Sequence, residues 1–141
     1  MDIAAPPDGD GWEQFAARGP FSSMIGPFWH RIAPDGVREH GFRVEGRHCN
    51  SYRILHGGMV LGFMDGVFAH AAFAALGTGS VTVRLAGDNL DMARAGEWIS
   101  GRASPLSVVD GLVTLDGGAW CGARPLWRGM AVFKTVRRPV R

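Results

Sequence analysis

Five residues between positions 50 and 65 have the types and spacing of a site that could act on a carbonyl group. Asn50 is a neutral amide, which can hold a water or a carbonyl oxygen without titrating. His56 is followed by Gly57 and Gly58, and glycine N–H groups at the start of a helix are unpaired donors at the positive end of its dipole. Asp65 follows on the same stretch and can act as a general base or a nucleophile. These groups predict an oxyanion site with an acid for acyl transfer.

A long apolar helix must position these groups. The stretch Ile54–Leu76 is apolar on every face of the helical wheel and carries one formal charge, Asp65. Its helical part from position 57 onward would measure ~30 Å, which is long enough to cross a membrane. Asp65 near mid-bilayer, the flanking His56 and His70 and four glycines favour instead a helix buried inside one soluble domain. Taken alone, Asp65 could equally be a solvated or salt-bridged residue at a helix edge.

The rest of the chain reads as short alternating strands on both sides of this helix, separated by Gly and Pro turns. This pattern predicts an α+β layer in which an antiparallel sheet of six strands curls around the helix. One helix cannot cover both faces of such a sheet, so we expect a dimer that extends it or covers its open face. In chain order we expect a short helix at Trp12–Ala17, strands at Phe28–Ile32 and Val37–Arg47, the long helix, and strands at Val81–Ala86, Trp98–Ala103, Leu112–Leu115 and Leu126–Val136.

Length and composition fit a single domain over residues 1–141 in the cytoplasm. The hydrophobic share of 46% and the charged share of 20% are ordinary for a globular protein, and a net charge of +2 gives no nucleic-acid footprint. Residues 1–11 are polar, rich in Pro and Gly and without an apolar run, so we expect a loose lead-in rather than a signal peptide. Two cysteines make no disulfide framework. Three arginines crowd the C-terminus as a solvated tail or a phosphate-binding rim: Arg137, Arg138 and Arg141.

The run from Asn50 to Gly58, followed by Asp65, resembles the signature of hotdog-fold acyl-CoA thioesterases. The nearest branch is the PaaI-like one, related to the 4-hydroxybenzoyl-CoA thioesterases. Its pattern is an Asn, a Gly three residues on, His-Gly-Gly three after that, and an acidic residue nine after the His. The order of the elements also matches, and Val132–Lys134 resembles the family's last strand. The resemblance implies a hotdog fold, and this chain supplies Asn50, His56, Gly57, Gly58 and Asp65 at the family's offsets.

The spacing within the helix implies a site shared between two chains. Gly57 and Asp65 are eight residues apart, or ~12 Å along a helix axis, so one substrate carbon cannot touch both in one chain. The resemblance implies that two antiparallel helices meet at a dimer interface and that each site takes its acid from the partner. We therefore expect a dimer or a dimer of dimers.

Two further positions follow from the resemblance. Thr82 falls where related enzymes place a water-binding hydroxyl, although a Thr in a strand is ordinarily a strand former. The family's glycine after the asparagine is Arg53 in this chain. If that glycine allows a tight turn, Arg53 must take the turn another way, or else its side chain projects into the substrate channel and binds substrate.

The reaction implied is hydrolysis of an acyl-CoA or acyl-carrier thioester to a free acid and a thiol. It uses no cofactor, because coenzyme A is part of the substrate, and no metal, nucleic acid or membrane. A non-catalytic acyl-CoA sensor on the same fold is the main alternative, and a hotdog hydratase is a third. The acyl group, the carrier, the role of Asp65 as base or nucleophile, and dimer against tetramer stay open.

Other candidate constellations are weaker. His48, Cys49 and His56 match no zinc spacing. Adjacent strand residues point to opposite faces, which argues against Cys49 and His48 as a nucleophile pair. His70 stands among alanines and is expected to be a satisfied core histidine.

Overall fold

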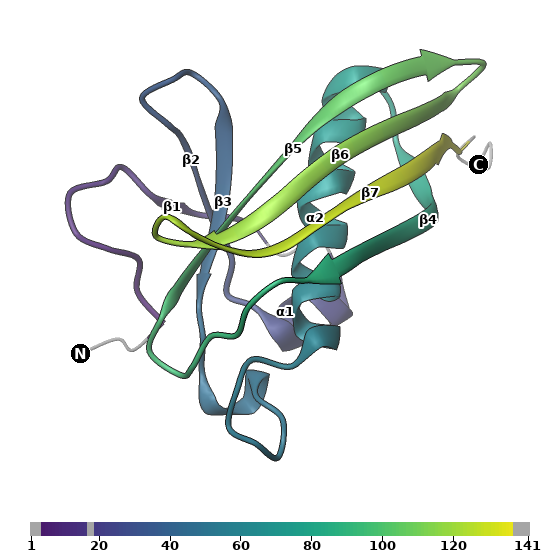
Figure 1. Ribbon diagram of the computed structural model, residues 1–141. Coiled ribbons are helices and arrows are strands. Elements are labelled where there is room, and N and C mark those ends of the chain that lie inside the picture. Colours follow the sequence, from purple (N-terminus) through teal and green to yellow (C-terminus); the bar gives the residue numbers. More distant parts are fainter. Residues whose placement is uncertain (1–3, 17–18, 137–141) are drawn as a thin grey trace.

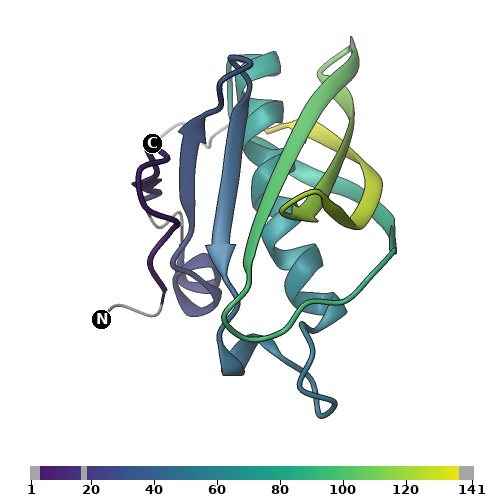
Figure 2. The same cartoon turned by 60° about the vertical axis from the view of Figure 1, so that its left-hand side comes forward.

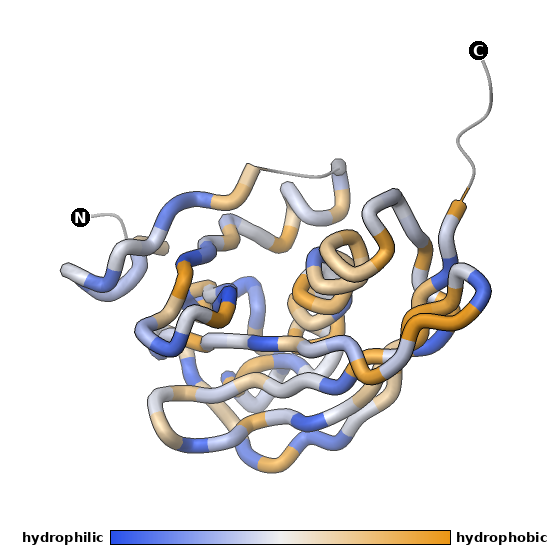
Figure 3. Tube along the Cα trace, turned by 90° about the horizontal axis from the view of Figure 1, so that it is seen from above, coloured by the Kyte–Doolittle hydropathy of each residue, from blue (hydrophilic) through white to orange (hydrophobic). Residues whose placement is uncertain are grey.

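Helix α2 (Gly57–Leu76) runs through the middle of the structure, and its span matches the predicted helix. The computed structural model describes residues 4–16 and 19–136. His56 precedes the first turn in an extended conformation. Gly77 ends the helix in the left-handed conformation (φ 71°), which glycine adopts without steric cost. Figure 3 looks along α2 and shows hydrophobic residues around most of its circumference.

Seven antiparallel strands form one sheet in the order β1-β2-β3-β5-β6-β7-β4. The sheet curls around α2, and the short helix α1 lies beside the N-terminal half of α2 (Figures 1 and 2). The predicted α+β architecture, an antiparallel sheet wrapped around a long central helix, is confirmed. The remaining elements are β1 (Glu13–Gln14), α1 (Pro20–Ile25), β2 (Trp29–Ile32), β3 (Arg38–Arg43), the 3-10 helix η1 (Gly46–His48), β4 (Ser80–Asn89), β5 (Trp98–Val109), β6 (Leu112–Cys121) and β7 (Arg124–Thr135).

The N-terminal segment adds a strand where we predicted a helix. The helix over Trp12–Ala17 is wrong for the part described: Glu13–Gln14 form strand β1, and Ala17 lies outside the described residues. The N–H of Phe15 also donates to the carbonyl of Phe28 (2.8 Å), which continues the pairing beyond β1. This segment is held by backbone hydrogen bonds to the edge of β2. Such pairing leaves no mark in the spacing of apolar residues, which is why the spacing predicted a helix instead. The sheet therefore has seven strands rather than six.

Three strands, β4, β5 and β6, continue past the residues at which we expected them to stop. Strand β5 passes Pro105, with a register shift between Pro105 and Ser107 that lets the ladder tolerate a residue without an N–H. Strand β6 runs through Gly117–Gly118, past the end of the strand predicted over Leu112–Leu115. Glycine is required there, since a Cβ on Gly117 would lie 2.5 Å from the carbonyl oxygen of Arg102.

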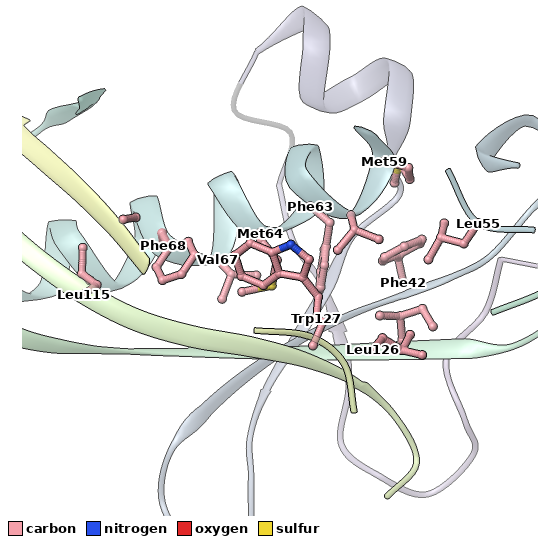
Figure 4. Packing of buried hydrophobic residues seen from close by; sticks show 14 of the residues in the cluster. Phe42, Leu55, Met59, Phe63, Met64, Val67, Phe68, Leu115, Leu126 and Trp127 are labelled. Atoms are coloured by element: carbon pink, nitrogen blue, oxygen red, sulfur yellow. The ribbon is translucent and has the colours of Figure 1, made fainter. Parts of the chain in front are cut away.

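A row of glycines crosses the sheet beneath two core rings. Gly87 pairs with Gly129, and Gly129 pairs with Gly117. A Cβ on Gly87 or Gly129 would lie 2.1 or 2.4 Å from the ring of Trp127, and one on Gly117 would lie 3.0 Å from the ring of Phe68. Figure 4 shows both rings packed beside α2, where their centroids are 6.1 Å apart. The glycine row thus lets large rings rest directly on the strand backbone.

The expected loose lead-in is tied to the sheet over its described part, residues 4–11. The guanidinium of Arg43 donates to the carbonyl of Ala5 (2.9 Å), and that of Arg31 donates to the carbonyl of Asp10 (3.1 Å). Because each bond joins a strand to the segment, both would have to break for this part to detach. The C-terminal arginines Arg137, Arg138 and Arg141 lie outside the described residues.

Helix α2 is long and apolar enough, by length and composition, to cross a membrane. In this structure it packs against strands β4, β5, β6 and β7. Its buried side chains belong to the same hydrophobic core as those of the sheet. Its composition is therefore explained by its place in a protein core.

Candidate active site

His56 caps α2 and occupies one of the two glycine donors. Its Nδ1 accepts a hydrogen bond from the N–H of Gly58 (2.8 Å), so the ring carries no proton on Nδ1 and Nε2 remains the donor. A Cβ on Gly58 would lie 3.0 Å from that Nδ1, which explains why glycine suits this position. The N–H of Gly57 has no hydrogen-bond partner among residues 4–16 and 19–136. Of the two donors predicted for the oxyanion, Gly57 is thus the one that is open.

Asn89, at the end of β4, lies beside this donor. An ideal Cβ on Gly57 would be 3.5 Å from Nδ2 and 3.8 Å from Oδ1 of Asn89, which is ordinary contact. The amide of Asn89 is exposed and can donate or accept next to the open N–H. Our sequence reading did not find this residue, because it lies beyond the strand predicted over Val81–Ala86 and no motif marks it.

Asn50 closes the loop that leads into α2. Its Oδ1 accepts from the N–H of Tyr52 (2.9 Å) and more weakly from that of Ile54 (3.4 Å). The backbone N–H of Asn50 donates to the carbonyl of Ile54 (2.9 Å). These bonds use the side-chain oxygen, so Asn50 positions the loop and keeps its Nδ2 as the group that can meet a substrate.

Arg53 adopts the left-handed conformation, with φ 61°. Its backbone therefore has the conformation that glycine favours, although the position carries a side chain. The N–H of Arg53 donates to the carbonyl of Asn50 (2.9 Å), which helps to hold a conformation that L-residues rarely adopt. Its side chain, like that of Tyr52 next to it, is exposed.

The carboxylate of Asp65 is hydrogen-bonded to strand β4. The hydroxyl of Thr82 donates to Oδ1 of Asp65 at 2.6 Å, so these two predicted site residues meet within one chain. Asp65 is half-buried, and its Oδ2 has no hydrogen-bond partner in the described parts of the chain. One carboxylate oxygen is therefore held and the other is available to a substrate or a water.

The structure thus forms two groups of candidate residues on one helix. Asn50, His56, Gly57 and Gly58 lie at the N-terminus of α2, and Asp65 with Thr82 lies two turns further on. Eight residues of helix keep the groups ~12 Å apart along the axis. A hollow of about 430 Å³ adjoins the first group and is lined by His56, Gly58 and side chains of α1 and η1.

The other histidines have structural partners. His48 is buried: its Nδ1 accepts from the N–H of Glu45 (3.0 Å), and its Nε2 donates to the carbonyl of Ile25 (2.8 Å). Burial lowers the pKa of His48, which keeps the ring neutral. The ring of His70 packs edge-on against that of His40, with centroids 5.1 Å apart. Among the described residues, no group of three or more His, Cys, Asp or Glu side chains could hold a metal ion.

No family model and no curated protein matches this sequence. Solved structures do match it. The E. coli PaaI protein from the phenylacetic acid degradation operon superposes with a TM-score of 0.74 at 15% identity, over 85% of this chain and 86% of that one. The BH2602 protein from Bacillus halodurans, solved with CoA, gives 0.72 at 18% identity over 82% and 76%. A hypothetical thioesterase from Streptococcus pneumoniae, solved with coenzyme A, gives 0.70 at 14% identity over 80% and 88%. The predicted hotdog fold is thereby confirmed.

Proposed function

We propose that this protein hydrolyses an acyl-CoA or acyl-carrier thioester to a free acid and a thiol, at sites shared between two copies of the chain. The observation that carries the proposal is the division of the site along α2: an open N–H at Gly57, and a carboxylate at Asp65 with one free oxygen. The fold is shared with thioesterases and with proteins solved with coenzyme A. That likeness supports the substrate class, and the two groups on α2 support the reaction.

The chemistry assigned to each group follows from its surroundings. The N–H of Gly57, at the positive end of the helix dipole, stabilises the negative charge that develops on the thioester oxygen, and such donors typically contribute ~3 kcal/mol. Asn89 is a further donor beside it, and the Nδ2 of Asn50 is a donor on the loop that leads into α2. Asp65 either takes a proton from the attacking water or attacks the carbonyl itself. In both cases the C–S bond breaks, water supplies the oxygen of the acid, and the thiolate leaves as a thiol. No cofactor takes part.

An unpaired sheet edge supports the sharing of sites. Strand β4 ends the sheet order, and its ten residues have one neighbouring strand, β7. Val81 and Val83 on this strand are half or more exposed, as is Phe73 on α2. A long edge strand with apolar side chains is a template for pairing with another chain. Antiparallel pairing of two β4 strands would set the two α2 helices antiparallel on the same side, so that each Gly57 approaches the other chain's Asp65.

Release of free thiol from a panel of acyl-CoA thioesters in the presence of a thiol-reactive dye tests the proposal. We expect turnover with at least one aliphatic or aryl member, and its loss in Asp65→Asn. Thioester binding without thiol release would instead establish the alternative, a non-catalytic acyl-CoA sensor. Because acyl-CoA thioesters are intracellular metabolites, the proposal places the protein in the cytoplasm.

A further inference from the structure

A cavity of about 520 Å³ lies between α2 and the N-terminal segment of the same chain. Its wall is mainly apolar and includes three phenylalanine rings, with hydroxyl groups of α1 at one side. This volume is in the range of pockets that hold small organic ligands. The principal apolar side chains of the wall are Phe15, Pro27, Phe28, Phe63 and Val67.

The cavity reaches α2 at two glycines that flank Asp65 in sequence, although Asp65 itself is not part of its lining. Gly62 and Gly66 belong to its lining, one turn before Asp65 and one residue after it. Neither glycine has a side chain to separate the cavity from the surface that carries the carboxylate. A substrate whose carbonyl carbon meets Asp65 can therefore extend its acyl group past these glycines into the cavity of the same subunit.

Gly66 is the open part of this wall. A Cβ on Gly66 would meet no heavy atom within 4 Å, whereas one on Gly62 would lie 3.0 Å from Cδ1 of Ile25 on α1. The first atom of a side chain at position 66 thus meets no neighbour, and Gly66 belongs to the cavity lining. A glycine inside a helix lowers the stability of the helix by about 1 kcal/mol relative to alanine. If position 66 only had to form the helix, a residue with a side chain would therefore be more stable there.

Resting on the proposed function, we propose that this cavity is the acyl-binding pocket for the thioester that reacts at Asp65, and that Gly66 sets its capacity. The lining also includes His40 and Arg47, and the guanidinium of Arg47 is already paired with Glu45. The rest of the wall is mainly apolar and suits a hydrocarbon group, because burying an unpaired charge against it is costly. A water molecule takes about 30 Å³ of liquid volume, so the cavity has room for well over ten groups of that size. An apolar acyl group of medium length, about six to ten carbons, fits this volume with space to spare.

Gly66→Leu tests the pocket, with hydrolysis of octanoyl-CoA and acetyl-CoA compared. We expect kcat/KM for octanoyl-CoA to fall at least tenfold more than kcat/KM for acetyl-CoA, since only the longer chain needs the filled space. Gly66→Ala should lower the ratio of kcat/KM for octanoyl-CoA to kcat/KM for acetyl-CoA by a smaller factor. This variant keeps the test possible if Gly66→Leu fails to fold. Ala74→Leu is the matched control, because it adds the same side chain to an exposed position of α2 outside this cavity.

Binding of S-octyl-CoA, a thioether that cannot be hydrolysed, is measured in parallel by calorimetry. If both Gly66 variants hydrolyse thioesters with an unchanged ratio of kcat/KM for octanoyl-CoA to kcat/KM for acetyl-CoA, the assignment of the acyl pocket is overturned. The proposed function would still stand. Failure of the wild type to release thiol from any thioester would overturn the proposed function. The binding arm then decides the pocket: affinity weakened tenfold or more by Gly66→Leu but not by Ala74→Leu supports it, and unchanged affinity overturns it.

Discussion

The hydrogen bond between Thr82 and Asp65 ties a strand to the middle of an apolar helix. At 2.6 Å it is a short bond to a carboxylate oxygen, of the charge-assisted kind that is stronger than a neutral pair. It restricts rotation of the carboxyl group and so fixes where Oδ2 points. For a base or a nucleophile, such orientation matters as much as basicity.

Asp65→Asn should abolish turnover while the protein still folds. The amide oxygen can still accept the bond from Thr82, but an amide can neither take a proton from water nor attack a carbonyl. We expect kcat to fall by ~10² or more, with affinity for S-octyl-CoA kept. Steady-state thiol release and calorimetry measure the two quantities. A folded Asp65→Asn protein with wild-type kcat would remove Asp65 from the mechanism.

Arg53 allows a second test at the scale of a single residue. A non-glycine residue in the left-handed region costs roughly 1–2 kcal/mol, whereas glycine pays mainly through the entropy of the unfolded chain. Arg53→Gly should therefore change the free energy of unfolding by less than about 1 kcal/mol. Arg53→Val should destabilise by about 2 kcal/mol, because a β-branched side chain tolerates positive φ poorly. Urea unfolding compares the two variants. Equal free energies of unfolding would show that the left-handed backbone at position 53 does not disfavour a β-branched side chain.

The sequence predicted those site residues that belong to one contiguous motif. Asn50, His56 and Gly57 lie within eight residues, so local spacing was enough to place them around one helix start. Thr82 came from the resemblance, and the structure brings it to Asp65. Asn89 could not be predicted, because its position beside Gly57 depends on the length of β4 and on the way the sheet closes over the helix.

Among the elements, α2 was the easiest to predict and the strands were the hardest. The helix has a histidine cap, a glycine stop and an unbroken apolar run, and these local signals agree. The ends of β5 and β6 depend on pairing with neighbours, which carried both strands through residues that usually break them. Pro105 is absorbed by a register shift, and Gly117 by contact with a core ring.

Helix α1 is held to the body mainly by η1. Arg47 donates to the carbonyls of Met24 and Gly26, and His48 donates to that of Ile25 between them. Three successive carbonyls at the C-terminal end of α1 thus depend on two adjacent side chains. Because α1 borders both the hollow at His56 and the cavity at Gly66, these bonds help to shape the candidate site.

The pKa of His48 predicts that stability falls in mildly acidic solution. Burial lowers this pKa below 6.5 in the folded state, and the positive charge of Arg47 lowers it further. The hydrogen bond to Ile25 and the negative charge of Glu45 act in the opposite direction. The unfolded chain therefore binds the proton first as the pH falls through 6.5. The contribution of neutral His48 to the free energy of unfolding is fully present above pH 6.5. It is lost between pH 6.5 and the lower pKa of the folded state, with a slope of at most about 1.4 kcal/mol per pH unit.

Urea unfolding of the wild type and of His48→Gln between pH 5 and 8 checks this prediction. The difference in unfolding free energy between the two proteins should shrink as the pH falls, because the glutamine does not titrate. The other histidines are common to both proteins and cancel in the difference. A difference independent of pH would show that His48 keeps its ordinary pKa.

At the scale of the whole molecule, the sheet has one short edge and one long one. Strand β1 contributes two residues to the first edge, and β4 contributes ten to the second. The sequence led us to expect a partner because one helix could not cover the sheet, and the structure locates the uncovered backbone on β4. The residues that project from this edge and those on the open side of α2 are what a second copy would cover.

Hybrids of two inactive chains test the proposed sharing of sites. A dimer of one Asp65→Asn chain and one Gly57→Val chain has one site with both lesions and one with neither. With full subunit exchange half the dimers are hybrids, so about a quarter of wild-type activity should return. Hybrids isolated by co-expression with two tags should give about half of wild-type activity in thiol-release assays, because one of their two sites is intact. Hybrids as inactive as their parents, with heterodimers confirmed, would mean that Gly57 and Asp65 serve one site within one chain.

The glycine row beneath Trp127 and Phe68 also bears on how this sequence can change over time. A methyl group on Gly87 or Gly129 collides with the indole, and a smaller ring in place of the indole leaves a void over bare backbone. A Cβ on Gly129 would also lie 2.3 Å from the carbonyl oxygen of Ala86, and one on Gly87 would lie 2.6 Å from that of Arg128, so a smaller ring at position 127 makes room for neither. Neutral drift at these glycines is therefore closed to single steps and also to a paired change of glycine and ring, because the neighbouring strand backbone fills the remaining space.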